Sequence, residues 1–149
     1  MFKVSMSGVR SFDRVPDGNY QLRVEEVKSI EKFVKIKDKL GAEQETKCRV
    51  ISCSLVVAAP EQFQGMIPSF RHNVKFFGDQ FSWHNGWAHK FLKAIDQPYQ
   101  SAADGTLEVE PKNWLGQIFY AVVVSRQDDK TGKVFQYLGD FEKATHATP

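Results

Sequence analysis

Residues 67–95 read IPSFRHNVKFFGDQFSWHNGWAHKFLKAI, and the spacing of their apolar side chains changes once, near Gly78. Before this glycine, Val74 and Phe76 alternate with polar residues, which is the period of a β-strand. After it, apolar residues recur about every four positions, which is the period of a helix with one buried stripe. The predicted stripe consists of Trp83, Trp87, Phe91, Leu92 and Ile95. The stretch therefore predicts a strand that passes directly into a helix, with both tryptophans in the core.

The rest of the chain reads as further β-strands: a first strand in two runs, at residues 19–28 and 30–40, and then strands at residues 46–58, 117–126 and 134–141. The alternation in the first of these slips at Val27, which predicts a β-bulge where the sheet curls. Three strands, a helix and two strands is the order of the OB-fold. The sequence thus predicts a mainly β protein, a five-stranded Greek-key barrel with one helix between the third and fourth strands.

Composition indicates one soluble domain at residues 15–141, between an N-terminal arm at residues 1–14 and a tail at 142–149. The net charge of +2 does not by itself imply a polyanionic partner, but 12 Phe, 4 Tyr and 3 Trp make the chain rather aromatic. Cys48 and Cys53 should point to opposite faces of one strand, so we expect free thiols. With no signal peptide or membrane-spanning segment expected, the sequence predicts a cytoplasmic protein.

Two motifs resemble a known family. VPDGNY at residues 15–20 opens the first strand, and WLGQIF at residues 114–119 opens the fourth. In this order they resemble the small OB-fold single-stranded-DNA-binding proteins that bacteriophages encode, over residues 15–141. The resemblance implies a protein that coats single-stranded DNA in the host cytoplasm during replication, recombination or repair, beside replication or recombination proteins. Many proteins of this function carry an acidic C-terminal tail, and FEKATH at residues 141–146 is not acidic.

The residues themselves indicate the same chemistry, because sequence-tolerant binding of a single strand needs cations for phosphates and exposed aromatic rings for bases. The outward face of the strand before Gly78 offers both types. The candidate binding residues are Lys35, Lys37, Lys47, Arg49, Arg71, Lys75, Phe77, Phe135 and Tyr137. Two alternatives remain: the lysines can be a solvated face that protects an edge strand, and the last two aromatics can cover the underside of the barrel.

Enzymatic patterns are weak in this sequence. His84 and His89 are five residues apart on a predicted helix, so their side chains do not converge on a metal. Asp128 and Asp129 fit plain turn chemistry, and no phosphate-binding glycine loop is present. We therefore expect a non-enzyme without cofactor or metal. The second hypothesis is a β-barrel module that docks a protein of a replication or virion assembly through the same aromatic surface.

Overall fold

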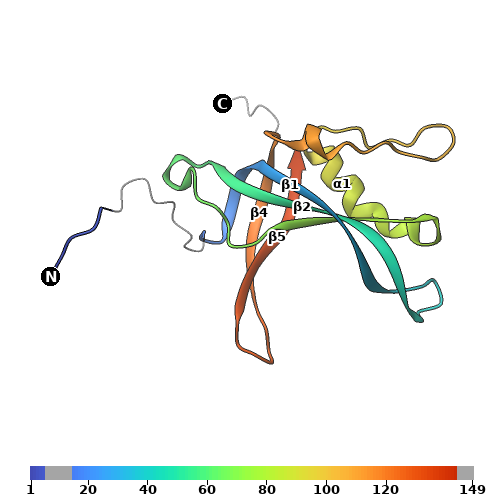
Figure 1. The fold of residues 1–149 in the computed structure, drawn as a ribbon, viewed down its shortest axis with the longest axis horizontal. Coiled ribbons are helices and arrows are strands. Elements are labelled where there is room, and N and C mark those ends of the chain that lie inside the picture. Colours follow the sequence, from blue (N-terminus) through green and yellow to red (C-terminus); the bar gives the residue numbers. More distant parts are fainter. Residues whose placement is uncertain (6–14, 144–149) are drawn as a thin grey trace.

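The computed structural model describes residues 1–5 and 15–143, which form one antiparallel five-stranded sheet and one α-helix (Figure 1). The strands are β1 (Gly18–Lys37), β2 (Glu43–Ala59), β3 (His72–Phe77), β4 (Ile118–Gln127) and β5 (Val134–Lys143). The helix is α1 (Gly86–Ala94), and the connections contain the short 3-10 helices η1 (Glu61–Phe63), η2 (Asp79–Asn85) and η3 (Pro111–Trp114). The predicted mainly β class, antiparallel sheet and helix between the third and fourth strands are confirmed.

The predicted arm and tail are described only in part. Residues 6–14 of the arm and 144–149 of the tail lie outside the described residues. Strand β5 continues to Lys143, so the first two tail residues belong to the sheet. At the other end, Val15 is fully buried, and its carbonyl oxygen accepts a hydrogen bond of 2.5 Å from Nε2 of Gln136.

Strand β1 is continuous where the sequence indicated two runs broken near Val27. Its register against β2 shifts between Val24 and Glu26, so the predicted bulge is present slightly earlier in the strand. Residues 18–23 pair with β4, and residues 21–23 pair with β2 as well, whereas the part after the bulge pairs, among the described strands, with β2 alone. The two strands therefore extend from the body of the sheet as a hairpin (Figure 1).

The sheet is not closed into the predicted barrel. Its strand order is β3-β2-β1-β4-β5, so β3 and β5 are edges that do not pair with each other. Phe91 of α1 lies between them, with its ring centroid 4.7 Å from that of His72 on β3 and 5.5 Å from that of Phe141 on β5. Because the buried ring of Phe91 lies between them, the two strands cannot approach here to the spacing of about 5 Å that pairing requires.

The helix predicted after Gly78 is divided into η2 and α1. Phe81 within η2 has φ −131° and ψ 26°, so the 3-10 turns do not continue the α-helical register. The buried stripe consists of Ala88, Phe91, Leu92 and Ile95. Trp83 and Trp87 lie outside this stripe and are 44% and 65% exposed, so their assignment to the core is wrong. The physical reason is that the helix begins only at Gly86, which places Trp83 before it and Trp87 at the flank of its first turn.

Trp114 belongs to the core, a position that the sequence left open. It is 1% exposed, and its ring centroid lies 5.7 Å from that of Phe91 and 6.3 Å from that of Phe76.

Cys48 and Cys53 are buried free thiols, as expected, and burial raises the pKa of Cys53 to about 12. No helix in the described part of the chain is long and apolar enough to cross a membrane.

Candidate nucleic-acid interface

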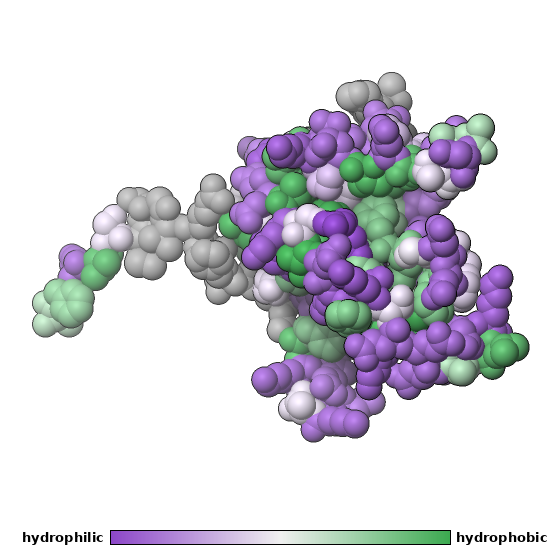
Figure 2. Space-filling model, turned by 45° about the vertical axis from the view of Figure 1, so that its right-hand side comes forward, coloured by the Kyte–Doolittle hydropathy of each residue, from purple (hydrophilic) through white to green (hydrophobic). Residues whose placement is uncertain are grey.

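The open seam between β3 and β5 forms a groove of about 500 Å³. Its walls are the two edge strands, and its ends are η2 and the first turn of α1. The lining residues are His72, Asn73, Val74, Lys75, Phe77, His84, Trp87, Ala88, Tyr137, Leu138, Gly139 and Phe141. The side of the molecule that carries α1 shows apolar residues in green among hydrophilic residues in purple (Figure 2). The groove thus combines aromatic rings from β3, η2, α1 and β5 with one lysine, Lys75.

The β3 wall has the faces that the sequence predicted. Val74 pairs with Ile51 and is buried, whereas Lys75 pairs with Val50 on the opposite face and is exposed. Phe77 shares the face of Lys75, is half-buried, and its ring centroid lies 5.4 Å from that of His84. A cation and an aromatic ring therefore stand two residues apart on one wall, roughly 6–7 Å along the strand.

The edge of β3 offers backbone hydrogen-bonding groups to the groove. The side chain of Asn85 holds both backbone groups of Phe77: the N–H donates to Oδ1 at 2.7 Å, and Nδ2 donates to the carbonyl at 3.1 Å. These groups of Phe77 therefore point away from β2. Since backbone groups alternate in direction along a strand, those of Lys75 and Asn73 also point toward the seam. A ligand in the groove can meet donors and acceptors as well as rings.

The β5 wall carries the two aromatics predicted in the last hairpin. Phe135 and Tyr137 are 48% and 41% exposed, with ring centroids 6.2 Å apart. Tyr137 lines the groove, and Phe135 lies next to it toward the hairpin tip. The register pairs Phe135 with Arg126 of β4, so this face also carries a cation that the sequence analysis did not single out.

Trp87 lines the groove, although the sequence analysis assigned it to the core. Its ring centroid lies 5.9 Å from that of Phe141, and Nζ of Lys90 lies 5.1 Å from the ring centroid of Trp87. Lys90 also forms an ion pair with Asp140 of β5, which ties the helix to the groove wall. Gly86 was the feature of the sequence that could have shown that Trp87 lies at the start of the helix. Glycine is a poor helix former, and here it is the first residue of α1 rather than an interior one.

The other predicted cations do not join this groove. The register sets Phe77 opposite Cys48, so Lys47 and Arg49 on either side of that cysteine point to the other face of the sheet. Both bind Glu31, at 2.8 and 2.9 Å, and the hydrogen bond from Lys47 lowers the pKa of that carboxyl. Lys35 and Lys37 share the face of Lys47 along the hairpin. The predicted basic track across neighbouring strands is therefore split between two faces.

Arg71 immediately precedes β3, at the end of the strand away from Phe77. Its Nε donates to Oγ of Ser52 at 2.7 Å, and its guanidinium lies 3.8 Å from the carboxylate of Glu26. Of the nine predicted residues, the structure brings Lys75, Phe77 and Tyr137 together in the groove, with Phe135 beside it.

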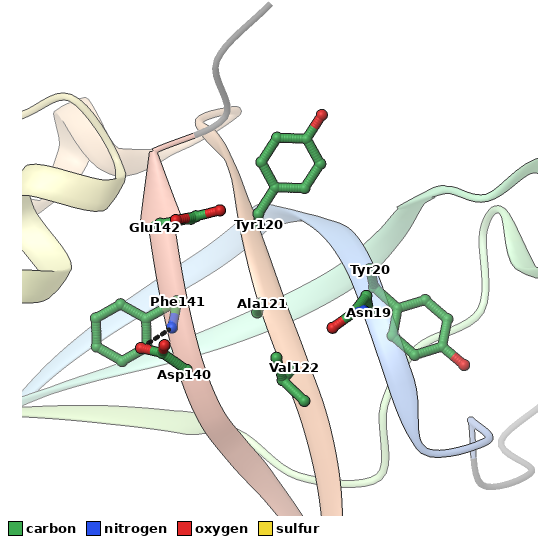
Figure 3. A pocket seen from close by; sticks show the side chains of 8 residues that line it. All are labelled: Asn19, Tyr20, Tyr120, Ala121, Val122, Asp140, Phe141 and Glu142. Atoms are coloured by element: carbon green, nitrogen blue, oxygen red, sulfur yellow. Dashed lines mark hydrogen bonds between the residues drawn. The ribbon is translucent and has the colours of Figure 1, made fainter. Parts of the chain in front are cut away.

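A second hollow, of about 300 Å³, lies over β1, β4 and β5 (Figure 3). Its lining includes Asn19, Tyr120 and the carboxylates of Asp140 and Glu142, and contains no lysine or arginine. Carboxylates repel phosphates, so this hollow is a poor match to a nucleic acid. The seam groove is the better candidate.

Lowering the pH should destabilise the fold through His72, which is packed against Phe91 and Phe141 at the closed end of the groove. Burial lowers the pKa of His72 to about 4, from 6.5. The unfolded chain then binds a proton near pH 6.5 that the folded chain binds only near pH 4. Stability due to this group is therefore complete above about pH 6.5 and falls, by up to about 1.4 kcal/mol per pH unit, on acidification through that interval.

Urea unfolding at about pH 7, 5.5 and 4.5 measures this effect. His72→Phe should have a shallower pH dependence than the wild type, because it removes the buried titrating group. His89→Gln, which removes a histidine at an exposed position, is measured alongside as the comparison variant. Equal slopes for the wild type and His72→Phe would contradict the assignment.

Among the described residues, no group of three or more His, Cys, Asp or Glu side chains is placed to hold a metal ion. The groove offers rings, backbone groups and a lysine, which suit binding of a planar, anionic ligand by stacking and phosphate contact.

Comparison with protein-family models and with curated proteins finds no match to this chain.

Proposed function

We propose that this protein binds single-stranded DNA without sequence preference and coats it during phage-type replication, recombination or repair. We also propose that its sheet is an OB-type fold whose barrel is open between β3 and β5. The strand count, the antiparallel pairing and the helix after the third strand support this assignment. The protein would act by binding alone, without catalysis.

The observation that carries the proposal is the convergence of aromatic rings and a lysine at the seam. Phe77 and Tyr137 come from strands at opposite ends of the sheet order, yet line one groove together with Lys75. Such rings accept any base because every base has a π-face, and each stacked base is worth about 1–3 kcal/mol. Lysine contributes phosphate contacts that depend on salt and not on sequence.

Fluorescence anisotropy with labelled oligo-dT and a matching duplex tests the proposal. We expect the single strand to bind more tightly than the duplex, because only unpaired bases can stack on the rings. We also expect affinity to fall as the salt rises from about 50 to 300 mM, because binding releases counterions from the phosphates. Equal binding of both forms would contradict single-strand specificity, and no binding at the lower salt would remove the proposal.

A protein-interaction module is the second candidate, favoured by the mostly apolar lining of the groove and by the two edge strands, β3 and β5, that border it. An extended peptide could add to such an edge through main-chain hydrogen bonds. This candidate takes precedence if the oligonucleotide does not bind at about 50 mM salt.

A further inference from the structure

A third hollow adjoins the groove at the start of α1. It measures about 520 Å³ and is lined by Trp83, His84, Gly86, Trp87 and Lys90. Two of these, His84 and Trp87, also line the seam groove, so the two spaces are adjacent. The two exposed tryptophans of the chain thus stand on one surface that runs from the seam toward the β1–β2 hairpin.

The rings around this hollow are held in place by neighbours. The ring centroid of Trp83 lies 5.4 Å from that of Phe81, which is buried, and 5.2 Å from that of His84. Nε2 of His84 lies 3.3 Å from the carbonyl oxygen of Lys37, so it can donate to the end of β1. These contacts fix Trp83 from behind and leave 44% of its surface open to solvent.

An ammonium group lies over the ring of each tryptophan. Nζ of Lys39 lies 5.0 Å from the ring centroid of Trp83, and Nζ of Lys90 lies 5.1 Å from that of Trp87. Lys90 is also paired with Asp140, whereas Lys39 forms no ion pair with the residues that the structure describes. A base that replaces such an ammonium over an exposed indole ring would stack there, and the released ammonium would be free to meet a phosphate of the same strand.

Gly86 lines the hollow between the two tryptophans. A Cβ built at this position has no atom within 4 Å, and the backbone, at φ −58° and ψ −41°, is ordinary α-helix that any residue adopts. Neither strain nor close packing therefore requires glycine here, although glycine weakens a helix. An absent side chain does keep the space between the rings open.

We propose that the hollow between Trp83 and Trp87 is a stacking site for a nucleobase of single-stranded DNA, which continues the path of the strand from the groove past the start of α1. This site rests on the proposed function and extends it to a surface that lies outside the seam. The nucleotide in it would stack on Trp83 in place of the ammonium of Lys39, which would move from the ring to the adjoining phosphate.

Trp83→Ala and Gly86→Leu test the site with labelled dT12 by anisotropy at about 50 mM salt. The first removes the ring, and the second fills the hollow without disturbing the helix. Each should weaken binding by roughly 5- to 150-fold, the loss expected for one stacked base. Leu115→Ala, an exposed apolar residue beside η3, is the matched control and should bind as the wild type does.

Tryptophan fluorescence gives a second readout. Bound dT12 should quench the wild-type signal, and the variant Trp83→Phe/Trp87→Phe should lose most of this quenching, because Trp114 is buried. If Phe77→Ala weakens binding but Trp83→Ala and Gly86→Leu stay within twofold of the wild type, the stacking site is wrong and the proposed function stands. If the wild type itself fails to bind dT12, both are wrong.

Discussion

Phe91→Ala is expected to lower the free energy of unfolding by about 3–5 kcal/mol, the usual cost of truncating a buried aromatic residue. The side chain is 0% exposed. Its ring contacts those of His72, Trp114, Phe119 and Phe141. Truncation would leave a cavity where the helix joins both edges of the open sheet, and urea unfolding followed by circular dichroism measures the loss.

Trp87→Ala is the matched control, one helical turn earlier. Trp87 is 65% exposed, so its truncation should cost less than about 1 kcal/mol. A loss of several kcal/mol from Trp87→Ala, comparable with that from Phe91→Ala, would mean that both residues belong to the core, as the spacing of the sequence indicated.

Phe77→Ala/Tyr137→Ala is expected to weaken binding of single-stranded DNA by about 2–6 kcal/mol, at least 30-fold, because it removes one stacking ring from each wall of the groove. The upper part of the range requires the two rings to act independently. Anisotropy with oligo-dT at about 50 mM salt measures the change. Phe77 is half-buried, so circular dichroism must first show that the variant remains folded.

Phe33→Ala is the control for this prediction. Phe33 is 65% exposed and pairs with Lys47, on the face of the hairpin opposite to Phe77. Its truncation should leave binding unchanged. If Phe33→Ala weakens binding and the double variant does not, the strand of DNA lies instead on the face that carries Lys35, Lys37 and Lys47.

Much of the fold could be predicted because it depends on local patterns. Period-2 alternation placed Val74 inward and Lys75 outward in β3, and the register against β2 confirms both faces. The slip near Val27 predicted a bulge, which lies between Val24 and Glu26. These features depend on side chains a few residues apart along one strand, so a single stretch of sequence contains the information.

The candidate site was less predictable, because it depends on contacts between distant segments. Alternation along a strand shows which side chains share a face of that strand, but it does not show how neighbouring strands pair. The pairing of β2 with β3 turns Lys47 and Arg49 to the face opposite Phe77, beside Glu31. It also grouped Trp83 and Trp87 with the core, since a helical stripe depends on where the helix begins.

The sequence by itself determined a mainly β chain, the place of its helix, and the alternation that sets Lys75 and Phe77 on one face. Only the tertiary structure decided that the sheet stays open and that the groove lies between its edges. The physical reason is that alternation is a property of one strand, whereas the seam exists because Phe91 of α1 packs between β3 and β5 and keeps them apart.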